Sequence, residues 1–570
     1  MAELATRGST IEECDQAVAD LAANSEAWRA EPALDAVGVL ERLNDALMAS
    51  AQGWVEVACQ AKRIPADEPV ASEEWASVAI TARYVRLLAS ALSDIAAGSR
   101  PRFPGRPHPA LGGRTAVPAF PFDAIDKVAL SGFTAEVWLR SGVTAAQATD
   151  HQAGAWFGAG APGVSLVLGA GNQSSIPITD ALDRLFIARH PVILKMNPVN
   201  DYLGPILATV AAELVDRGVL RIVYGGEEVG THLVNHPAVT DVHVTGSDRT
   251  FEAIVFGGGD EGRRRKAAHE PLVTKPVSGE LASVTPVIVV PGPWEDKDIS
   301  FHAQNIASML TNNAGFNCVA LRAVITSNTW ELTDALLGGI RDVLNEVDDR
   351  YPYYPGARDR YDAFVAAHPD ARRLGDDAPG CVPWTAIPDL HPGVEDEIAF
   401  TVEAFNGVYA EVGIDAPGGT VEFIHRAVAF ANDELWGTLG CSLIVHPKSL
   451  KDPEVQRAFE QAIADLRYGT IAVNHWSGLG FLLGSTPWGS YPGQSIYDVQ
   501  SGIGFVRNSM MLADGDIEKT VCRGPFRMPL KPTWFVTSKT AHKAGEQFAR
   551  LMAKPSWGRL PGLVTTAMRG

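Results

Sequence analysis

Cysteines are few and dispersed: six occur in 570 residues, with no Cys-x-x-Cys pair among them. That spacing provides neither a disulfide framework nor a zinc site, and it favours a reducing compartment. No apolar run approaches the roughly 20 residues that span a bilayer. The first twenty residues lack the basic and apolar stretches of a signal peptide. We therefore expect a cytoplasmic protein without a metal and without a membrane partner.

Basic residues are outnumbered by acidic ones, 48 against 67, which gives a formal net charge of −19. Such an acidic balance disfavours binding to nucleic acids and to anionic membranes. The one basic run, GRRRKAAH at 262–269, predicts a solvated insertion. With 46% hydrophobic residues, the chain is long and apolar enough for a large core and several domains.

The first 150 residues read as mainly helical. Segments 35–63 and 73–97 repeat apolar residues at helical spacing, which predicts two long amphipathic helices. The Pro-, Gly- and Arg-rich stretch 98–113 predicts a surface loop. Alternating apolar and polar residues over 127–143 predict paired strands.

From residue 164 the pattern changes to short apolar strands that alternate with helices. This alternation predicts βαβ units and a parallel, doubly wound sheet, whose ligands bind at the carboxyl ends of the strands. Gly-rich turns follow two of these strands, in VLGAGNQSSIP and in VTGS. A second α/β stretch runs from 283 to about 480, and the Pro- and Trp-rich tail is expected to cap the fold or to bind another subunit.

Cys318 lies in TNNAGFNCVALRAVITS, residues 311–327. A single cysteine in such a setting is more often an inert, buried side chain than a nucleophile. VLGAGNQSSIP is equally ambiguous, because Ser174 occupies the third glycine position of a dinucleotide-binding motif. Each of these features has a plain structural interpretation when it is taken alone.

Seven segments, in this order, resemble motifs of the aldehyde dehydrogenase superfamily over roughly residues 160–510. They are LVLGAGNQSSIP, ARHPVILKMNP, HLVNHPAVTDVHVTGS, SGELASVTPVIVV, NNAGFNCVA, EAFNGVYAEV and FANDELWGTLGCSLIV. The resemblance implies that Cys318 is the nucleophile, Glu280 the general base and Asn172 the oxyanion donor. It also implies that NAD or NADP is bound by Lys195, Gly246, Ser247, Glu403 and Phe405.

The same resemblance implies an aldehyde-dehydrogenase-like α/β fold, with a Rossmann-type cofactor domain, an α/β catalytic domain and a small oligomerisation arm. We expect a homodimer or a homotetramer. The expected domains are an N-terminal helical part of the cofactor domain (1–126), a strand arm for oligomerisation (127–150), the NAD(P)-binding domain (151–282), the catalytic domain (283–480) and a return segment with a C-terminal extension (481–570).

The activity implied by the resemblance is NAD(P)-dependent oxidation of an aldehyde to a carboxylic acid through a thioester on Cys318. Two alternatives stay open: a CoA-acylating dehydrogenase or acyl-CoA reductase, and a catalytically silent scaffold. Glu280 favours water over CoA as the acyl acceptor, because CoA-dependent branches of the family commonly lack this base. Pro198 stands where NAD-preferring members often carry a Glu, so the sequence permits NADP as well as NAD.

Overall fold

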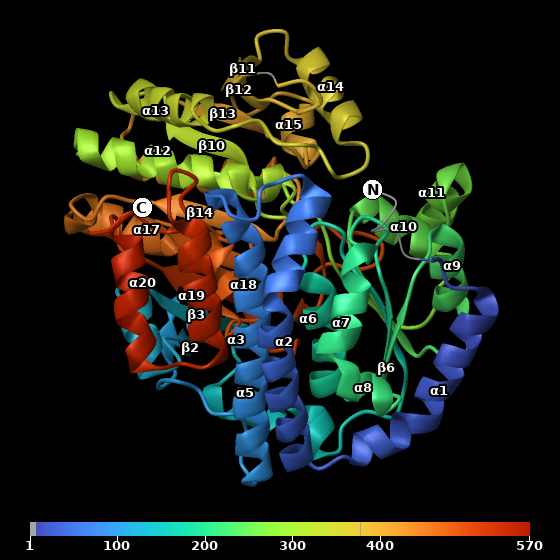
Figure 1. Ribbon diagram of the computed structural model, residues 1–570. Coiled ribbons are helices and arrows are strands. Elements are labelled where there is room, and N and C mark those ends of the chain that lie inside the picture. Colours follow the sequence, from blue (N-terminus) through green and yellow to red (C-terminus); the bar gives the residue numbers. More distant parts are fainter. Residues whose placement is uncertain (1–6, 377) are drawn as a thin grey trace.

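The computed structural model describes residues 7–376 and 378–570, which fold around two large sheets (Figure 1). One sheet has six strands in the order β17-β8-β7-β4-β5-β6. The other has eleven, in the order β1-β2-β3-β19-β15-β14-β9-β10-β13-β12-β11. A small two-stranded ladder joins β16 (Trp488–Gly489) to β18 (Phe505–Val506). Both large sheets have parallel centres flanked by helices, which confirms the predicted doubly wound α/β class.

The six-stranded sheet is parallel except for β17, which runs antiparallel to β8. Its inner strands are short and apolar because helices cover both faces of a parallel sheet. Its strands are β4 (Ser165–Leu168), β5 (Val192–Lys195), β6 (Leu220–Val223), β7 (Asp241–Thr245), β8 (Val277–Glu280) and β17 (Gly502–Ile503). The helices of this part are α1 (Ile11–Ala30), α6 (Ile176–Asp183), α7 (Gly204–Val210), α8 (Ala212–Asp216), α9 (Glu227–Asn235), α10 (Asp248–Phe256) and α11 (Gly259–Ala268).

The eleven-stranded sheet has a parallel centre and antiparallel ends. Its strands are β1 (His108–Ala110), β2 (Arg114–Phe120), β3 (Thr134–Leu139), β9 (Thr285–Val289), β10 (Leu321–Ser327), β11 (Arg372–Leu374), β12 (Trp384–Leu390), β13 (Val408–Ile414), β14 (Gly440–Ile444), β15 (Thr470–Val473) and β19 (Ile517–Arg523). Its helices are α12 (Asp296–Thr311), α13 (Thr333–Asn345), α14 (Ala357–Ala367), α15 (Ile398–Thr401), α16 (Thr420–Asp433), α17 (Pro453–Asp465) and α18 (Leu479–Leu483).

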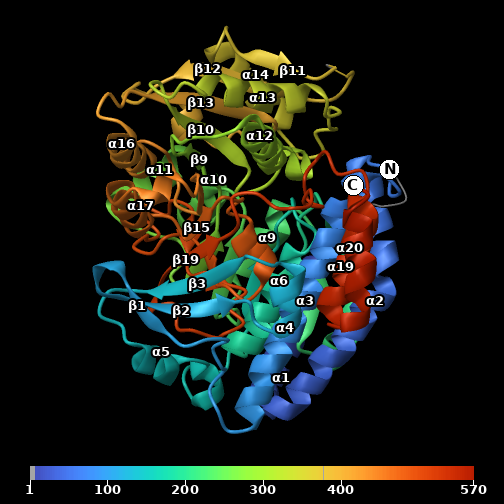
Figure 2. The same ribbon diagram turned by 90° about the vertical axis from the view of Figure 1, so that its left-hand side faces the viewer.

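Two long helices, α2 (Ala33–Lys62) and α3 (Ser72–Ala96), pack against each other as the sequence predicts. The C-terminal helix α19 (Ala541–Ala553) lies along α3, and α20 (Leu560–Ala567) follows it (Figure 2). Helices α2, α3 and α19 contribute to one hydrophobic core with α6, α7 and α8. The tail of the chain therefore packs against its own N-terminal helices, which confirms that it caps the fold.

The segment 127–143 differs from the predicted pair of strands. Its first residues belong to α4 (Ala124–Ala129), and only β3 is a strand. Asp123 stabilises the helix because its carboxylate accepts hydrogen bonds from the backbone N–H groups of Ile125 and Asp126. The partners of β3 are β2, the preceding strand, and the distant strand β19, so neither pairing lies within the segment 127–143 itself. A further short helix, α5 (Ala145–His151), ends this part.

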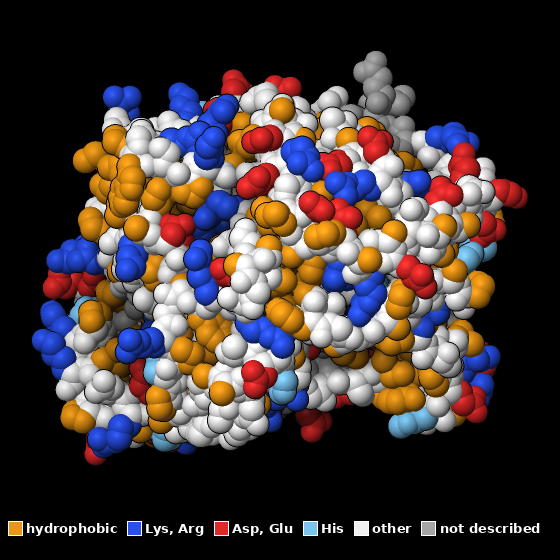
Figure 3. Space-filling view, turned by 90° about the horizontal axis from the view of Figure 1, so that it is seen from below, with side chains coloured by type: hydrophobic (Ala, Val, Ile, Leu, Met, Phe, Trp, Pro, Cys, Tyr) orange, Lys and Arg blue, Asp and Glu red, His pale blue; other side chains and the backbone are white. Residues whose placement is uncertain are grey.

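Charged side chains of both signs are interspersed with apolar ones on the face that Figure 3 shows. The basic run at 262–269 lies mainly in α11, where Arg264 and Arg265 pair with Glu261. Its positive charge is thus largely balanced by a neighbour one turn away, as expected of a solvated helix. Among the described residues, no helix combines the length and the hydropathy required to span a membrane.

Candidate active site

Cys318 lies in the loop between α12 and β10, where the chain turns tightly. Asn313, Ala314 and Gly315 have φ angles of 55°, 59° and 77°, a left-handed conformation that residues with a Cβ rarely adopt. At Gly315 an added Cβ would lie 2.3 Å from the carbonyl oxygen of Asn406. This turn holds the Cys318 loop close against the loop that precedes β13.

The thiol of Cys318 contacts Glu280, the last residue of β8 in the other sheet. Sγ donates a hydrogen bond to Oε1 at 3.1 Å. Burial raises the pKa of the Cys318 thiol well above its usual value, and the charge of Glu280 raises it further. Burial also raises the pKa of Glu280. The resting thiol is therefore neutral and needs a proton acceptor, and Glu280 is in position to serve as one.

A cavity of about 120 Å³ lies beside Cys318. Its walls come from α3, from the turn after β4, from α12 and from the loop that follows β15, and they are mostly apolar. The cavity gives a small molecule access to the sulfur. Its lining is Glu73, Ala76, Ser77, Ile80, Gln173, Ile176, Asn305, Ser308, Met309, Asn312, Asn317, Cys318, Val319, His475, Trp476, Gly478, Leu479, Phe481, Leu482, Trp488 and Trp534.

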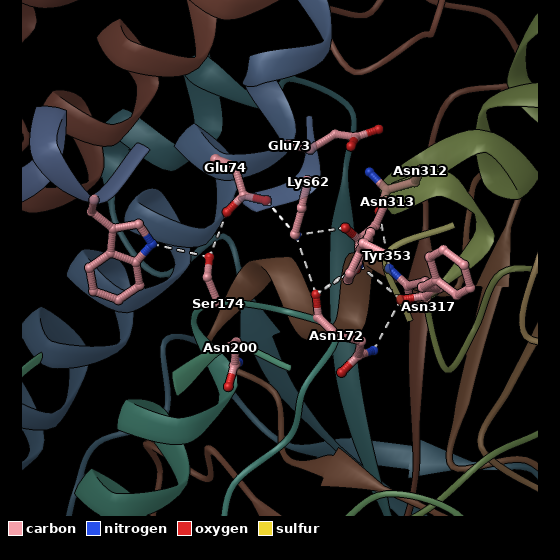
Figure 4. A network of polar contacts seen from close by, with 12 residues as sticks. Lys62, Glu73, Glu74, Asn172, Ser174, Asn200, Asn312, Asn313, Asn317 and Tyr353 are labelled. Atoms are coloured by element: carbon pink, nitrogen blue, oxygen red, sulfur yellow. Dashed lines mark hydrogen bonds and ion pairs between the residues drawn. The ribbon is translucent and has the colours of Figure 1, made fainter. Parts of the chain in front are cut away.

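Asn172 lies in the turn after β4 and is bonded to residues 311–318, here called the nucleophile segment after the predicted role of Cys318. Its side-chain Nδ2 donates to the carbonyl oxygen of Phe316 at 3.2 Å, and its backbone oxygen accepts from Asn313 Nδ2 at 2.9 Å and from the Tyr353 hydroxyl at 3.0 Å (Figure 4). The Asn172 amide is thus bonded to Phe316, which stands two positions before Cys318 in the chain. At this turn the cavity wall itself is formed by Gln173.

A buried ion pair supports this arrangement. Lys62 and Glu74 pair at the facing ends of α2 and α3, with side chains only 2% and 1% exposed. Lys62 Nζ also donates to Asn313 Oδ1 at 2.8 Å and to the backbone oxygen of Asn172 at 3.3 Å. Glu74 accepts from the Ser174 hydroxyl at 2.7 Å (Figure 4). The pair therefore connects the Asn172 turn to the nucleophile segment.

Sequence reasoning missed Lys62 and Glu74. Both stand at helix ends, where Lys in a last turn and Glu in a first turn are ordinary solvated residues. Their sequence neighbours carry the amphipathic pattern, but that pattern does not reveal which polar residue is buried against a third segment. Trp534, which lines the cavity from the C-terminal tail, was missed for the same reason.

The first three predicted cofactor residues lie at the carboxyl ends of two parallel strands that flank β4. Lys195 ends β5, and Gly246 and Ser247 follow β7, on either side of the turn after β4. Burial lowers the pKa of Lys195. Ser247 Oγ caps α10 by accepting from the N–H of Thr250 at 3.1 Å, and a Cβ at Gly246 would meet no atom within 4 Å. This edge of the sheet is the expected location of a nucleotide.

Glu403 and Phe405 lie in the loop before β13. Burial raises the pKa of Glu403 to about 8, although the charge of Arg322 opposes this shift. Oε1 of Glu403 is buried without a hydrogen-bond partner among the described residues. Phe405 packs against Phe316, with ring centroids 5.7 Å apart, and so contacts the nucleophile segment. The structure thus gathers Cys318, Glu280, Asn172 and Phe405 around one loop.

Residues 161–341 match the model of the aldehyde dehydrogenase family. This segment, about a third of the chain, is therefore similar to the aldehyde dehydrogenase family. The match contains Asn172, Glu280 and Cys318, so the family's sequence pattern covers all three predicted catalytic residues.

Curated aldehyde dehydrogenases match only over part of their lengths. Aldehyde dehydrogenase LUC3 from a Fusarium species is 30% identical over 131 residues, which is 23% of this chain and 25% of that protein. N-succinylglutamate 5-semialdehyde dehydrogenase from Sphingopyxis alaskensis is 27% identical over 168 residues, which is 29% of this chain and 31% of that protein. The matched region thus spans less than a third of these relatives.

Solved aldehyde dehydrogenase structures share the fold over nearly the whole chain. The NADP-dependent glyceraldehyde-3-phosphate dehydrogenase of Bacillus halodurans, complexed with NADP, has a TM-score of 0.61 at 17% identity and covers 90% of this chain and 91% of its own. A mutant of aldehyde dehydrogenase C from Pseudomonas syringae, complexed with NAD+ and octanal, also has a TM-score of 0.61 at 17% identity, covering 91% and 90%. Within the described residues, no group of three or more His, Cys, Asp or Glu side chains forms a metal site.

Proposed function

We propose that this protein oxidises an aldehyde to a carboxylic acid, with NAD or NADP as the hydride acceptor. The observation that carries the proposal is the 3.1 Å contact between Cys318 Sγ and Glu280 beside a cavity. A thiol paired with a base, next to a space for a small molecule, is the arrangement that covalent catalysis by cysteine requires. Among the solved structures of similar fold, one is complexed with NADP and another with NAD+ and octanal.

In the first half of the proposed reaction, Glu280 takes the thiol proton and the Cys318 thiolate attacks the carbonyl carbon. The carbonyl oxygen becomes an alkoxide, which needs hydrogen-bond donors in place. We assign the Asn172 amide to this task, together with the Cys318 backbone N–H. Asn172 Nδ2 carries two N–H groups, and Phe316 accepts from only one of them. A nicotinamide held by Glu403 and Phe405 would supply the acceptor for the hydride that leaves the substrate carbon.

In the second half, a thioester on Cys318 is hydrolysed. Glu280, after releasing its first proton to solvent, takes a proton from the attacking water, and the thiolate leaves. Its Oε2 atom is buried without a hydrogen-bond partner among the described residues, so it is free to accept from a water molecule. The balance is one aldehyde and one water consumed, and one acid, one hydride and one proton produced.

The predicted cofactor residues fit a nicotinamide dinucleotide. Glu403 presents a buried, unpartnered carboxylate oxygen that suits the hydroxyl groups of a ribose. Gly246 leaves open space at the end of β7. Lys195 ends β5, which is separated from β7 only by β4. Pro198 supplies no carboxylate against a 2′-phosphate, so we propose that NADP is accepted as well as NAD.

The competing proposal, transfer of the acyl group to CoA, is disfavoured by Glu280 in contact with the nucleophile. The deciding experiment measures NADH and NADPH formation from a panel of aldehydes, with and without CoA. We expect turnover without CoA. In Glu280→Gln we expect a burst of about one NAD(P)H per site followed by slow turnover, because the thioester forms but is not hydrolysed.

The matched control for that variant is Glu331→Gln, which changes an exposed carboxylate. A strict requirement for CoA would favour the acylating reaction. An absence of turnover with every aldehyde and both cofactors would favour the silent scaffold.

We further propose a homodimer or homotetramer, with β3 as part of an oligomerisation arm, in a cytoplasmic protein. The cytoplasmic assignment is supported by the six cysteines, all of which are free thiols. Light scattering coupled to size-exclusion chromatography measures the number of subunits, and cell fractionation tests the location. The domain limits at 126, 150, 282 and 480 are tested by limited proteolysis, which we expect to cleave near them.

A further inference from the structure

The cavity beside Cys318 is apolar and largely aromatic. Trp476, Phe481, Trp488 and Trp534 contribute rings, and several aliphatic side chains such as Leu479 complete the wall. Apolar walls of this kind select ligands by burial of apolar surface, and the few polar groups determine orientation. The character of the wall therefore carries information about the substrate.

In the part of the chain that the structure describes, the cavity lining contains no positively charged side chain that could pair with an anionic group. Among the described residues that line the cavity, Glu73 is the only one with a permanent charge, and it is already paired with Arg350 at 3.0 Å. Burial lowers the pKa of His475 to about 4, so its ring is neutral near pH 7. A carboxylate or phosphate on the substrate would have to be buried without a counter-ion, which is strongly unfavourable.

One buried cation lies close by but outside the lining. The guanidinium carbon of Arg507 is 3.1 Å from the ring centroid of Phe481 and 5.7 Å from that of Trp488. Arg507 is not among the residues that line the cavity, and its charge is attracted by Glu280 and Asp180. The aromatic rings therefore face the cavity, and Arg507 packs against them.

The size of the cavity limits the substrate further. Its volume of about 120 Å³ is close to that of an apolar cavity of about 150 Å³ that holds one benzene ring. A single aromatic ring or a short aliphatic chain fits this space, whereas a long chain would need the wall to move.

Part of that wall comes from the C-terminal tail. Trp534 packs against Phe133 and His475, with ring centroids 6.2 Å and 6.3 Å away. The adjacent residues anchor the tail to α12: the Val536 N–H donates to Ser308 Oγ at 2.9 Å, and the Thr537 hydroxyl donates to Gln304 Oε1 at 2.6 Å. Trp534 is thus held in the wall by bonds that do not depend on a ligand.

We propose that the cavity takes an uncharged, apolar aldehyde of about the size of one aromatic ring, and that Trp534 limits its length. The inference rests on the proposed dehydrogenase function and deepens it. It assigns a specificity role to a tail residue that lies outside the segment matched by the family model.

The charge part is tested with two aldehydes of nearly equal shape, 4-nitrobenzaldehyde and 4-carboxybenzaldehyde. We expect kcat/KM to be at least about 100-fold higher for the neutral compound, because the carboxylate would be buried unpaired. Calorimetric binding of both compounds to Cys318→Ala separates recognition from the different reactivities of the two carbonyl groups. We expect the neutral compound alone to bind measurably.

The length part is tested with Trp534→Ala and Trp534→Phe. We expect Trp534→Ala to raise the ratio of kcat/KM for 4-butylbenzaldehyde to kcat/KM for benzaldehyde by about 10-fold or more, because removal of the indole makes room for the methylenes of the butyl group. We expect Trp534→Phe to raise this ratio less. Trp557→Ala is the matched control, because Trp557 belongs to the same tail but is 59% exposed. A uniform loss of kcat for both substrates, with an unchanged ratio, would overturn the specificity role.

Equal activity with the two aldehydes, or preference for 4-carboxybenzaldehyde, would overturn the charge inference while leaving the dehydrogenase function intact. If that preference disappeared in Arg507→Met, Arg507 would be the carboxylate receptor instead. If no aldehyde were turned over, the proposed function would fail. Calorimetry with Cys318→Ala would then still decide the inference, because binding of only the neutral compound supports it and the reverse overturns it.

Discussion

The buried carboxylate of Glu403 gives a prediction with two opposite pH dependences. Burial raises its pKa from the ordinary 4.5 to about 8, and the charges of Arg322 and Arg360 offset this only in part. A raised folded-state pKa means that Glu403 contributes stability below pH 4.5 that is lost as the pH rises through about 8. The difference of about 3.5 pH units corresponds to about 5 kcal/mol.

Cofactor binding should show the reverse trend. Ribose hydroxyl groups donate to a carboxylate most strongly when it is ionised. At pH 6 only about 1% of Glu403 is ionised, so the apparent Kd for NAD or NADP should be about 100-fold higher than in fully ionised protein. We therefore expect the Kd to fall about tenfold per pH unit from 6 to 8 and to level off near 9.

Two assays measure these trends: calorimetric titration of the cofactor at five pH values, and thermal unfolding of the cofactor-free protein at the same values. In Glu403→Gln both pH dependences should be much weaker, and the variant should be more stable than the wild type at pH 9. Glu331→Gln, at an exposed position, should behave like the wild type. A cofactor Kd that is independent of pH in the wild type would refute the reasoning.

Three further predictions concern the Cys318 loop and the residues that contact it. Asn172→Ala should lower kcat by about 100-fold with little change in KM, because the lost hydrogen bond forms mainly in the transition state; a change in KM alone would place Asn172 in ground-state binding. Cys318→Ala should abolish turnover in steady-state assays and keep cofactor binding, whereas Cys522→Ala should leave turnover unaltered. Lys62→Met should destabilise the protein by about 3–5 kcal/mol in chemical denaturation, because Glu74 stays buried without its partner. In contrast, Arg42→Met should cost less than about 1 kcal/mol, since the Arg42–Glu213 pair is exposed, and equal losses would contradict the structural role of the Lys62 pair.

The sequence was sufficient for the fold class and for the order of the chemically important segments. The alternation of apolar strands and helices after residue 164 predicts the parallel strands β4 to β7 of the six-stranded sheet, because that periodicity follows directly from burial on both faces. The motifs predict Cys318, Glu280 and Asn172 as one site, since a family resemblance carries spatial information that periodicity lacks. The two long N-terminal helices are also predicted to within two residues at each end.

Tertiary structure alone decided which side chains support and shape that site. Lys62 and Glu74 are local helix-end residues in the sequence, and only their burial against Asn313 and Ser174 makes them a structural pair. Trp534 likewise reaches the Cys318 cavity across more than two hundred residues of chain. Periodicity indicates which face of an element is buried, but the partner of that face depends on long-range packing, which no local pattern encodes.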